Sequence, residues 1–248
     1  MKLEFAPIGY GTVGLARTGY VAVLRLQRAE RLNAYTPEMG EDLVSAFELT
    51  AQDAEIAAVV VTGEGRAFCA GADKECFTGA RGPSGFALGE EAFVRGYARQ
   101  IRNHPKLTIA AFNGVAVGIG VTMSLPMDIR LASAGAALKL NFAELGIMPG
   151  FGATYFLPHL VGLGQAKKLL LCENRIDANR ALELGLIDEV VEDARLLERA
   201  ILLGQQAAAL KPHVRSAIKA ALNAGAEHGF EAALETEAAS DLRKGPQQ

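Results

Sequence analysis

Tryptophan is absent from this sequence of 248 residues, and cysteine and histidine are scarce, with three and four residues. The cysteines are odd in number and show no C-x-x-C spacing: Cys69, Cys76 and Cys172. This pattern excludes a framework of paired disulfides and indicates reduced thiols, as in a cytoplasmic protein. The histidines are scattered without the spacing of metal ligands: His104, His159, His213 and His228. We therefore expect no metal site.

Blocks of like charge and long apolar runs are also missing. The net charge is −3 with acids and bases interspersed, so nothing indicates a nucleic acid or another polyanion as partner. No apolar run reaches the roughly 18 residues that a membrane span needs. The start Met1-Lys2-Leu3-Glu4 is unlike a signal peptide, so we expect a cytoplasmic protein without membrane contact. Half of the residues are hydrophobic, which is enough to bury a large core.

The most informative stretch is LTIAAFNGVAVGIGVTMSLP, from Leu107 to Pro126. Its first six residues predict a buried strand, followed by an Asn-Gly turn of the kind that tolerates positive φ. Gly118 and Gly120 then precede a predicted helix over Val121 to Leu125. A helix start carries free N–H groups and partial positive charge, which favour an oxyanion or a phosphate. Close packing of a helix on a sheet explains the same glycines without a ligand.

A second buried strand, Ala58 to Thr62, leads to a turn of small residues, FCAGAD, from Phe68 to Asp73. Two strand ends of this kind can place two backbone N–H groups around one oxygen. The motifs FCAGAD, NGVAVGIG and LGIMPGFGAT follow one another in this order. In sequence and spacing they resemble the crotonase (enoyl-CoA hydratase/isomerase) superfamily. The resemblance extends from about Tyr20 to about Leu242.

The resemblance implies an α/β fold with a crotonase-like spiral ββα core and a C-terminal helical trimerisation region. We expect the core, with an N-terminal strand ribbon, over residues 1–190 and the helical region over 191–248. In the family the helical region packs against neighbouring subunits in trimers, often stacked into hexamers. Within it, Lys211-Pro212 predicts a break before two helices, Val214 to Ala224 and Gly229 to Arg243.

The resemblance also implies an acyl-CoA thioester as substrate, with coenzyme A as part of it and no separate cofactor. The family pattern puts two oxyanion-hole N–H groups on Ala72 and Ile119, each next to a glycine, Gly71 or Gly118. Two such donors stabilise a thioester enolate, and each is worth on the order of 3 kcal/mol in comparable sites.

Four further residues match the family's coenzyme A site. The Ala70 carbonyl corresponds to the acceptor of the adenine amino group, and Lys74 to the rim of the tunnel. Arg28 and Arg31 correspond to the arginine-rich turn near the nucleotide end. Taken alone, two arginines in a turn also fit solvated surface charge. The resemblance implies that Asp73 holds its turn.

The usual catalytic acids are missing. Enoyl-CoA hydratases take one glutamate from each of two segments, and the matching positions here are Thr122 and Phe142. The isomerase branch places its acid just after a proline, where this chain has Gly150. General acid–base catalysis typically contributes ~10²–10⁴-fold, so these gaps predict weak standard activity. Glu144 is the one nearby acid and either serves as a base or is a surface residue, while Thr122 could orient a water.

Three functions are compatible with this pattern. The first is an acyl-CoA-processing enzyme of the hydratase/isomerase type that uses its oxyanion hole with altered acids. The second is a decarboxylase or C–C hydrolase of β-dicarbonyl compounds. A decarboxylase can rely on the oxyanion hole because its substrate supplies the leaving CO₂, and PGFGATYFLPHLVG, Pro149 to Gly162, resembles the hydrolase branch. The third is a non-catalytic protein that binds acyl-CoA.

Two glycine-rich segments lie outside these motifs. Gly9 to Gly14 matches the dinucleotide fingerprint G-x-G-x-x-G, but Tyr20 to Leu26 predicts a strand where the fingerprint needs a helix. A hairpin-like ribbon is therefore the alternative. Cys76 to Glu90 predicts a mobile loop, and in the family the matching segment covers the acyl pocket.

Overall fold

The computed structural model describes residues 3–79, 81–173 and 175–240. Its centre is a seven-stranded sheet with the order β1-β2-β3-β4-β6-β8-β11. The strands are β1 (Ala6–Ile8), β2 (Val13–Thr18), β3 (Val21–Leu26), β4 (Ala58–Gly63), β6 (Leu107–Phe112), β8 (Ile129–Ser133) and β11 (Glu189–Val191). The first three strands pair antiparallel, and every pair from β3 to β11 is parallel.

A second sheet has the order β10-β9-β7-β5. Its strands are β5 (Ala67–Cys69), β7 (Val115–Val117), β9 (Ala137–Lys139) and β10 (Arg175–Asp177). Three times in succession a strand of the large sheet is followed by a strand of the small one: β4 by β5, β6 by β7 and β8 by β9. This repeat is the ββα core that the sequence predicts.

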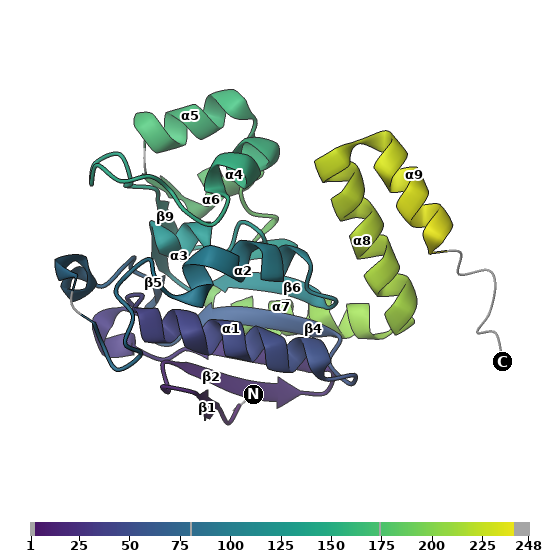
Figure 1. Cartoon of the computed structure of the whole chain (residues 1–248), viewed down its shortest axis with the longest axis horizontal. Coiled ribbons are helices and arrows are strands. Elements are labelled where there is room, and N and C mark those ends of the chain that lie inside the picture. Colours follow the sequence, from purple (N-terminus) through teal and green to yellow (C-terminus); the bar gives the residue numbers. More distant parts are fainter. Residues whose placement is uncertain (1–2, 80, 174, 241–248) are drawn as a thin grey trace.

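Helices pack around the sheets, whereas α8 and α9 form a pair that stands away from them (Figure 1). The helices are α1 (Pro37–Gln52), α2 (Ala92–Arg102), α3 (Ile119–Thr122), α4 (Ala153–Val161), α5 (Leu163–Leu171), α6 (Ala178–Glu183), α7 (Leu196–Ala208), α8 (Pro212–His228) and α9 (Phe230–Ala239). Three 3₁₀ turns are η1 (Ala29–Arg31), η2 (Lys74–Thr78) and η3 (Asp193–Arg195). Within the described ranges, no helix combines the length and apolar character that crossing a membrane requires.

Both faces of the large sheet are buried, which is why its parallel strands are apolar throughout. Along β3, Ala22 and Leu24 face the main core, whereas Val21 and Val23 face a second cluster on the other side. Helix α7 covers that second cluster, to which it contributes buried apolar side chains. α7 lies within residues 191–248, so part of the expected helical region packs directly on the sheet.

The turn between β6 and β7 lies at Asn113-Gly114 as predicted, but for a different physical reason. Neither Asn113 nor Gly114 has positive φ. Instead, Asn113 Oδ1 accepts a hydrogen bond from Gly63 N at 2.9 Å, which ties this turn to the end of β4. Gly114 is needed for space, because a Cβ there would clash with the carbonyl of Arg66. A short strand, β7, follows the turn, and the predicted helix begins two residues earlier than expected and is shorter, as α3 covers Ile119–Thr122.

The segment that matches the dinucleotide fingerprint is the tip of a hairpin between β1 and β2, as the ribbon alternative predicts. Its backbone wraps around the carboxylate of Asp42 on α1. Asp42 accepts hydrogen bonds from Tyr10 N at 2.7 Å, Thr12 N at 2.9 Å and Thr12 Oγ1 at 2.7 Å. The N–H groups that would hold a phosphate in a nucleotide site therefore hold a side chain of the protein itself.

Candidate active site

The turns after β5 and β7 lie side by side. These strands are parallel neighbours, with Cys69 opposite Ala116, and parallel strands end at the same edge of a sheet. Gly71, with φ of +100°, approaches the second turn so closely that a Cβ would lie 3.3 Å from the carbonyl of Val117. The structure thus brings together the two turns that carry Ala72 and Ile119.

The N–H of Ala72 points away from Tyr35, the residue whose backbone pairs with this turn. Tyr35 N donates to Gly71 O at 2.8 Å, and Asp73 N donates to Tyr35 O at 2.8 Å. Backbone groups alternate in direction along an extended chain, so the Ala72 N–H points to the opposite side. Ile119 begins α3, and the first N–H of a helix has no intrahelical acceptor. Both N–H groups are consequently available to an acceptor outside their own element.

Helix α3 is held against β5 by a close backbone contact. A Cβ at Gly120 would clash with the carbonyl oxygen of Cys69 and lie 2.9 Å from its Cβ. Gly118, just before the helix, has φ of +53° and donates its N–H to Lys139 O at 2.8 Å. The contacts of Gly118 and Gly120 with two strands of the small sheet therefore fix the position of Ile119 between them.

Asp73, which directly follows Ala72, is 5% exposed and binds two cations. Arg28 Nη2 lies 3.0 Å from Oδ2, and Arg31 Nη2 lies 3.2 Å from Oδ1. Burial raises the pKa of Asp73, but the hydrogen bonds from Arg28, the Glu75 N–H and Arg31 outweigh it and lower the pKa. Asp73 thus holds its turn as a carboxylate, and the two predicted tunnel arginines are engaged with it.

Ala70 and Lys74 flank this turn. Ala70 N donates to Leu32 O at 3.0 Å, which ties the end of β5 to the arginine-rich turn. Lys74 is exposed and begins η2. The structure thus ties the turn with Ala70 and Asp73 to the arginine-rich turn through backbone and ion-pair contacts.

The three positions where the family has its catalytic acids are Thr122, Phe142 and Gly150 in this chain. Thr122 on α3 is fully buried, and among the described atoms its Oγ1 has no hydrogen-bond partner. Phe142 packs its ring beside Gly118, 3.8 Å from where a Cβ would be. Gly150 precedes Phe151, which has φ of +58° and packs on the ring of Phe93 with centroids 4.9 Å apart.

Glu144 lies at the surface and pairs with a lysine of the small sheet. Its side chain is 51% exposed, and Oε2 lies 2.9 Å from Lys139 Nζ. Lys139 is also the residue of β9 whose carbonyl accepts a hydrogen bond from the Gly118 N–H, so Glu144 pairs with a residue that contacts the segment before α3. No cluster of three or more potential metal ligands occurs among the residues that the structure describes.

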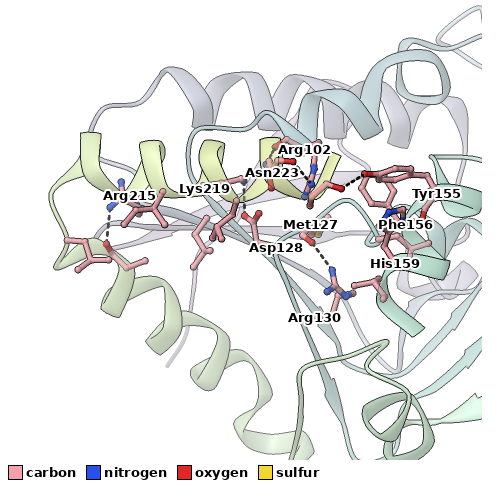
Figure 2. Close-up of a pocket in the computed structure, with 18 residues that line it drawn as sticks. Arg102, Met127, Asp128, Arg130, Tyr155, Phe156, His159, Arg215, Lys219 and Asn223 are labelled. Atoms are coloured by element: carbon pink, nitrogen blue, oxygen red, sulfur yellow. Dashed lines mark hydrogen bonds and ion pairs between the residues drawn. The ribbon is translucent and has the colours of Figure 1, made fainter. Parts of the chain in front are cut away.

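Figure 2 shows a separate pocket of about 470 Å³ between α4, α8 and the end of the large sheet. Lys219 from α8 reaches Asp128 Oδ2 at 2.7 Å, and Asn223 Nδ2 donates to Arg102 O at 2.8 Å. The described lining of this pocket includes none of the residues predicted for the acyl-CoA site.

The two sheets and the ββα repeat define a crotonase-like α/β protein. A model of the enoyl-CoA hydratase/isomerase family matches residues 16–243. The 1,2-epoxyphenylacetyl-CoA isomerase of Escherichia coli is 34% identical over 219 residues, which are 88% of this chain and 84% of that protein. The short-chain-enoyl-CoA hydratase of Clostridium acetobutylicum is 35% identical over 225 residues, 89% and 84% of the two chains.

A solved structure gives the same result. The enoyl-CoA hydratase from Bacillus anthracis superposes with a TM-score of 0.86 and 31% identity, covering 92% of this chain and 89% of the other. The chain therefore belongs to the enoyl-CoA hydratase/isomerase family, and the family that its motifs predict is confirmed.

Proposed function

We propose that this protein acts on acyl-CoA thioesters and stabilises a thioester enolate with the N–H groups of Ala72 and Ile119. The observation that carries the proposal is the contact between the two turns, with Gly71 against the carbonyl of Val117. Two fixed backbone donors beside one acyl oxygen require no reorganisation as negative charge develops. The names of the two relatives support the substrate class, since both describe coenzyme A thioesters.

The coenzyme A portion would lie along the turn that follows β5. The Ala70 carbonyl would accept from the adenine, and the exposed Lys74 would meet the phosphates. Arg28 and Arg31 would add positive potential while their guanidinium groups hold Asp73. In this proposal coenzyme A arrives with the substrate, and no further cofactor takes part.

For proton transfer we assign Glu144 as the acid–base group and Thr122 as a hydroxyl that orients a water. In this proposal the Glu144 carboxylate, which pairs with Lys139, accepts the proton from the substrate. The unpartnered Thr122 Oγ1 has a free donor and acceptor for a water or for the substrate.

Incubation with crotonyl-, 3-hexenoyl- and methylmalonyl-CoA, with products resolved by mass spectrometry, tests this function. We expect turnover of an enoyl ester and a loss of about 10²-fold in Glu144→Gln, which keeps the shape but not the base. Glu183→Gln is the matched control, because Glu183 is also exposed and paired with a cation, Arg180, but lies on α6. Unchanged turnover in Glu144→Gln would remove Glu144 from the mechanism.

The occupants of the usual acid positions favour a second function, the binding of acyl-CoA without turnover. Thr122, Phe142 and Gly150 cannot exchange a proton as a carboxylate does. Micromolar binding of all three esters with no product would establish this function. Release of CO₂ from methylmalonyl-CoA alone would instead indicate a decarboxylase, in which the substrate itself supplies the leaving group.

We further propose that the protein is a homotrimer, which can stack into a hexamer. Both α8 and α9 are fully described, and neither has a buried residue. Leu222 and Phe230 on these helices are 69% and 74% exposed. Exposed apolar surface of this kind indicates contact with another subunit. We expect a mass of three or six times 26.2 kDa by light scattering after size exclusion, and a monomer would contradict the proposal.

A further inference from the structure

Glu91, at the start of α2, is a carboxylate with no exposed surface. One oxygen accepts a hydrogen bond from Tyr35 Oη at 2.6 Å, and the other accepts from Gly89 N at 2.7 Å. A buried carboxylate needs hydrogen-bond donors, and these two bonds hold Glu91 in place.

The donor of the shorter bond, Tyr35, is the residue whose backbone clamps Ala72. Its N–H and carbonyl bind Gly71 O and Asp73 N, one residue to each side of Ala72. Its ring is fully buried against Phe93, with centroids 5.1 Å apart. The backbone of Tyr35 is thus held by the turn that contains Ala72, and its hydroxyl is held by Glu91.

The space around this bond leaves little freedom. Gly40 on α1 passes so close that a Cβ would clash with Tyr35 Oη and lie 2.7 Å from Phe93 Cβ. α1 and α2 pack against each other here, and Figure 1 shows them side by side over the sheets. A shift of Glu91 would therefore be transmitted to Tyr35 rather than absorbed by empty space.

We propose that Tyr35 and Glu91 form a positioning link that sets the direction of the Ala72 N–H. The inference rests on the proposed function, in which that N–H binds the thioester oxygen. Through Gly89, the link also joins Ala72 to the end of the glycine-rich segment that precedes α2. A substrate that moves this segment would change the strength of the oxyanion donor, because such donors act only when their geometry is held.

Tyr97 shows that a buried phenol in this cluster does not need such a bond. It is fully buried on α2, 4.1 Å from Phe93 between ring centroids, and its Oη has no hydrogen-bond partner among the described atoms. Tyr97→Phe therefore removes a hydroxyl from the same aromatic cluster without breaking a hydrogen bond. It is a matched control for Tyr35→Phe.

The probe is a cinnamoyl-CoA thioester, whose absorption moves to longer wavelength when its carbonyl oxygen accepts strong hydrogen bonds. We expect the wild type and Tyr97→Phe to show the full shift. Tyr35→Phe and Glu91→Ala should each retain less than about half of it, because a misdirected donor polarises the carbonyl less. The double variant should lose no more than either single variant, since both remove one link. Thermal unfolding confirms that each variant is folded.

The outcomes separate the two proposals. If bound cinnamoyl-CoA shows no shift in the wild type, the oxyanion function itself is wrong. If the wild type shifts and Tyr35→Phe shifts equally, the positioning link is overturned while the function stands. Losses that add up in the double variant would also overturn the link, because independent residues give additive effects.

Discussion

Replacing Gly120 with alanine is expected to lower the free energy of unfolding by about 3 kcal/mol. Turnover of an acyl-CoA thioester should fall by about 10²-fold, and the carbonyl of the bound thioester should be less polarised. The added Cβ would clash with the backbone carbonyl of Cys69, which belongs to β5 and cannot rotate away. α3 would have to move off β5, and the N–H of Ile119 would move with it. Urea unfolding and the thioester assays measure the two effects.

Gly164→Ala is the matched control for this prediction. Gly164 also lies in a helix, α5, but a Cβ there meets no atom within 4 Å. Alanine is the better helix former by about 1 kcal/mol, so this variant should be neutral or more stable. If Gly120→Ala is as stable and as active as Gly164→Ala, the close packing of α3 on β5 does not control the site.

The second large effect is a loss of stability in mild acid caused by His104. The side chain is 3% exposed, and its Nε2 lies 3.1 Å from Phe47 O. Burial, with a smaller effect of Lys219, lowers the pKa of His104 from 6.5 to about 4. Below pH 6.5 the unfolded chain takes up this proton and the folded chain does not. The free energy of unfolding should therefore fall by about 3 kcal/mol between pH 6.5 and pH 4.

Urea unfolding at a series of pH values checks this prediction. His104→Gln cannot take up the proton in either state, so its stability should vary less with pH over the same interval. His213→Gln is the control, because His213 is exposed on α8 and should leave the wild-type slope unchanged. A slope in His104→Gln equal to that of the wild type would contradict the assignment.

Local sequence patterns were sufficient for the long buried strands and for the best-capped helices. β6 covers the predicted residues Leu107–Phe112, because a strand buried on both faces is apolar without interruption. Helix α6 begins after Asp177, whose carboxylate accepts a hydrogen bond from Arg180 N at 2.8 Å, as is typical of an aspartate before a helix. These signals lie within a few residues of the element that they specify.

Elements that depend on distant neighbours were predicted less well. Val115–Val117 forms β7 because β5 and β9 flank it, and neither partner is visible in its own pattern. α8 extends from Pro212 to His228, beyond both ends of its predicted range. Proline is tolerated in the first turn of a helix, so Lys211-Pro212 starts this helix instead of only breaking the previous one.

The sequence by itself determined the family, the two turns that would carry the N–H donors, and the absence of acids at Thr122, Phe142 and Gly150. Each of these is a property of residue identity at a motif position. Only the tertiary structure decided that Tyr35 flanks Ala72 and binds Glu91, 56 residues away along the chain. Such pairs carry no local signal, because they are formed by the packing of α1 against α2 and by the bridge between Tyr35 and Ala72.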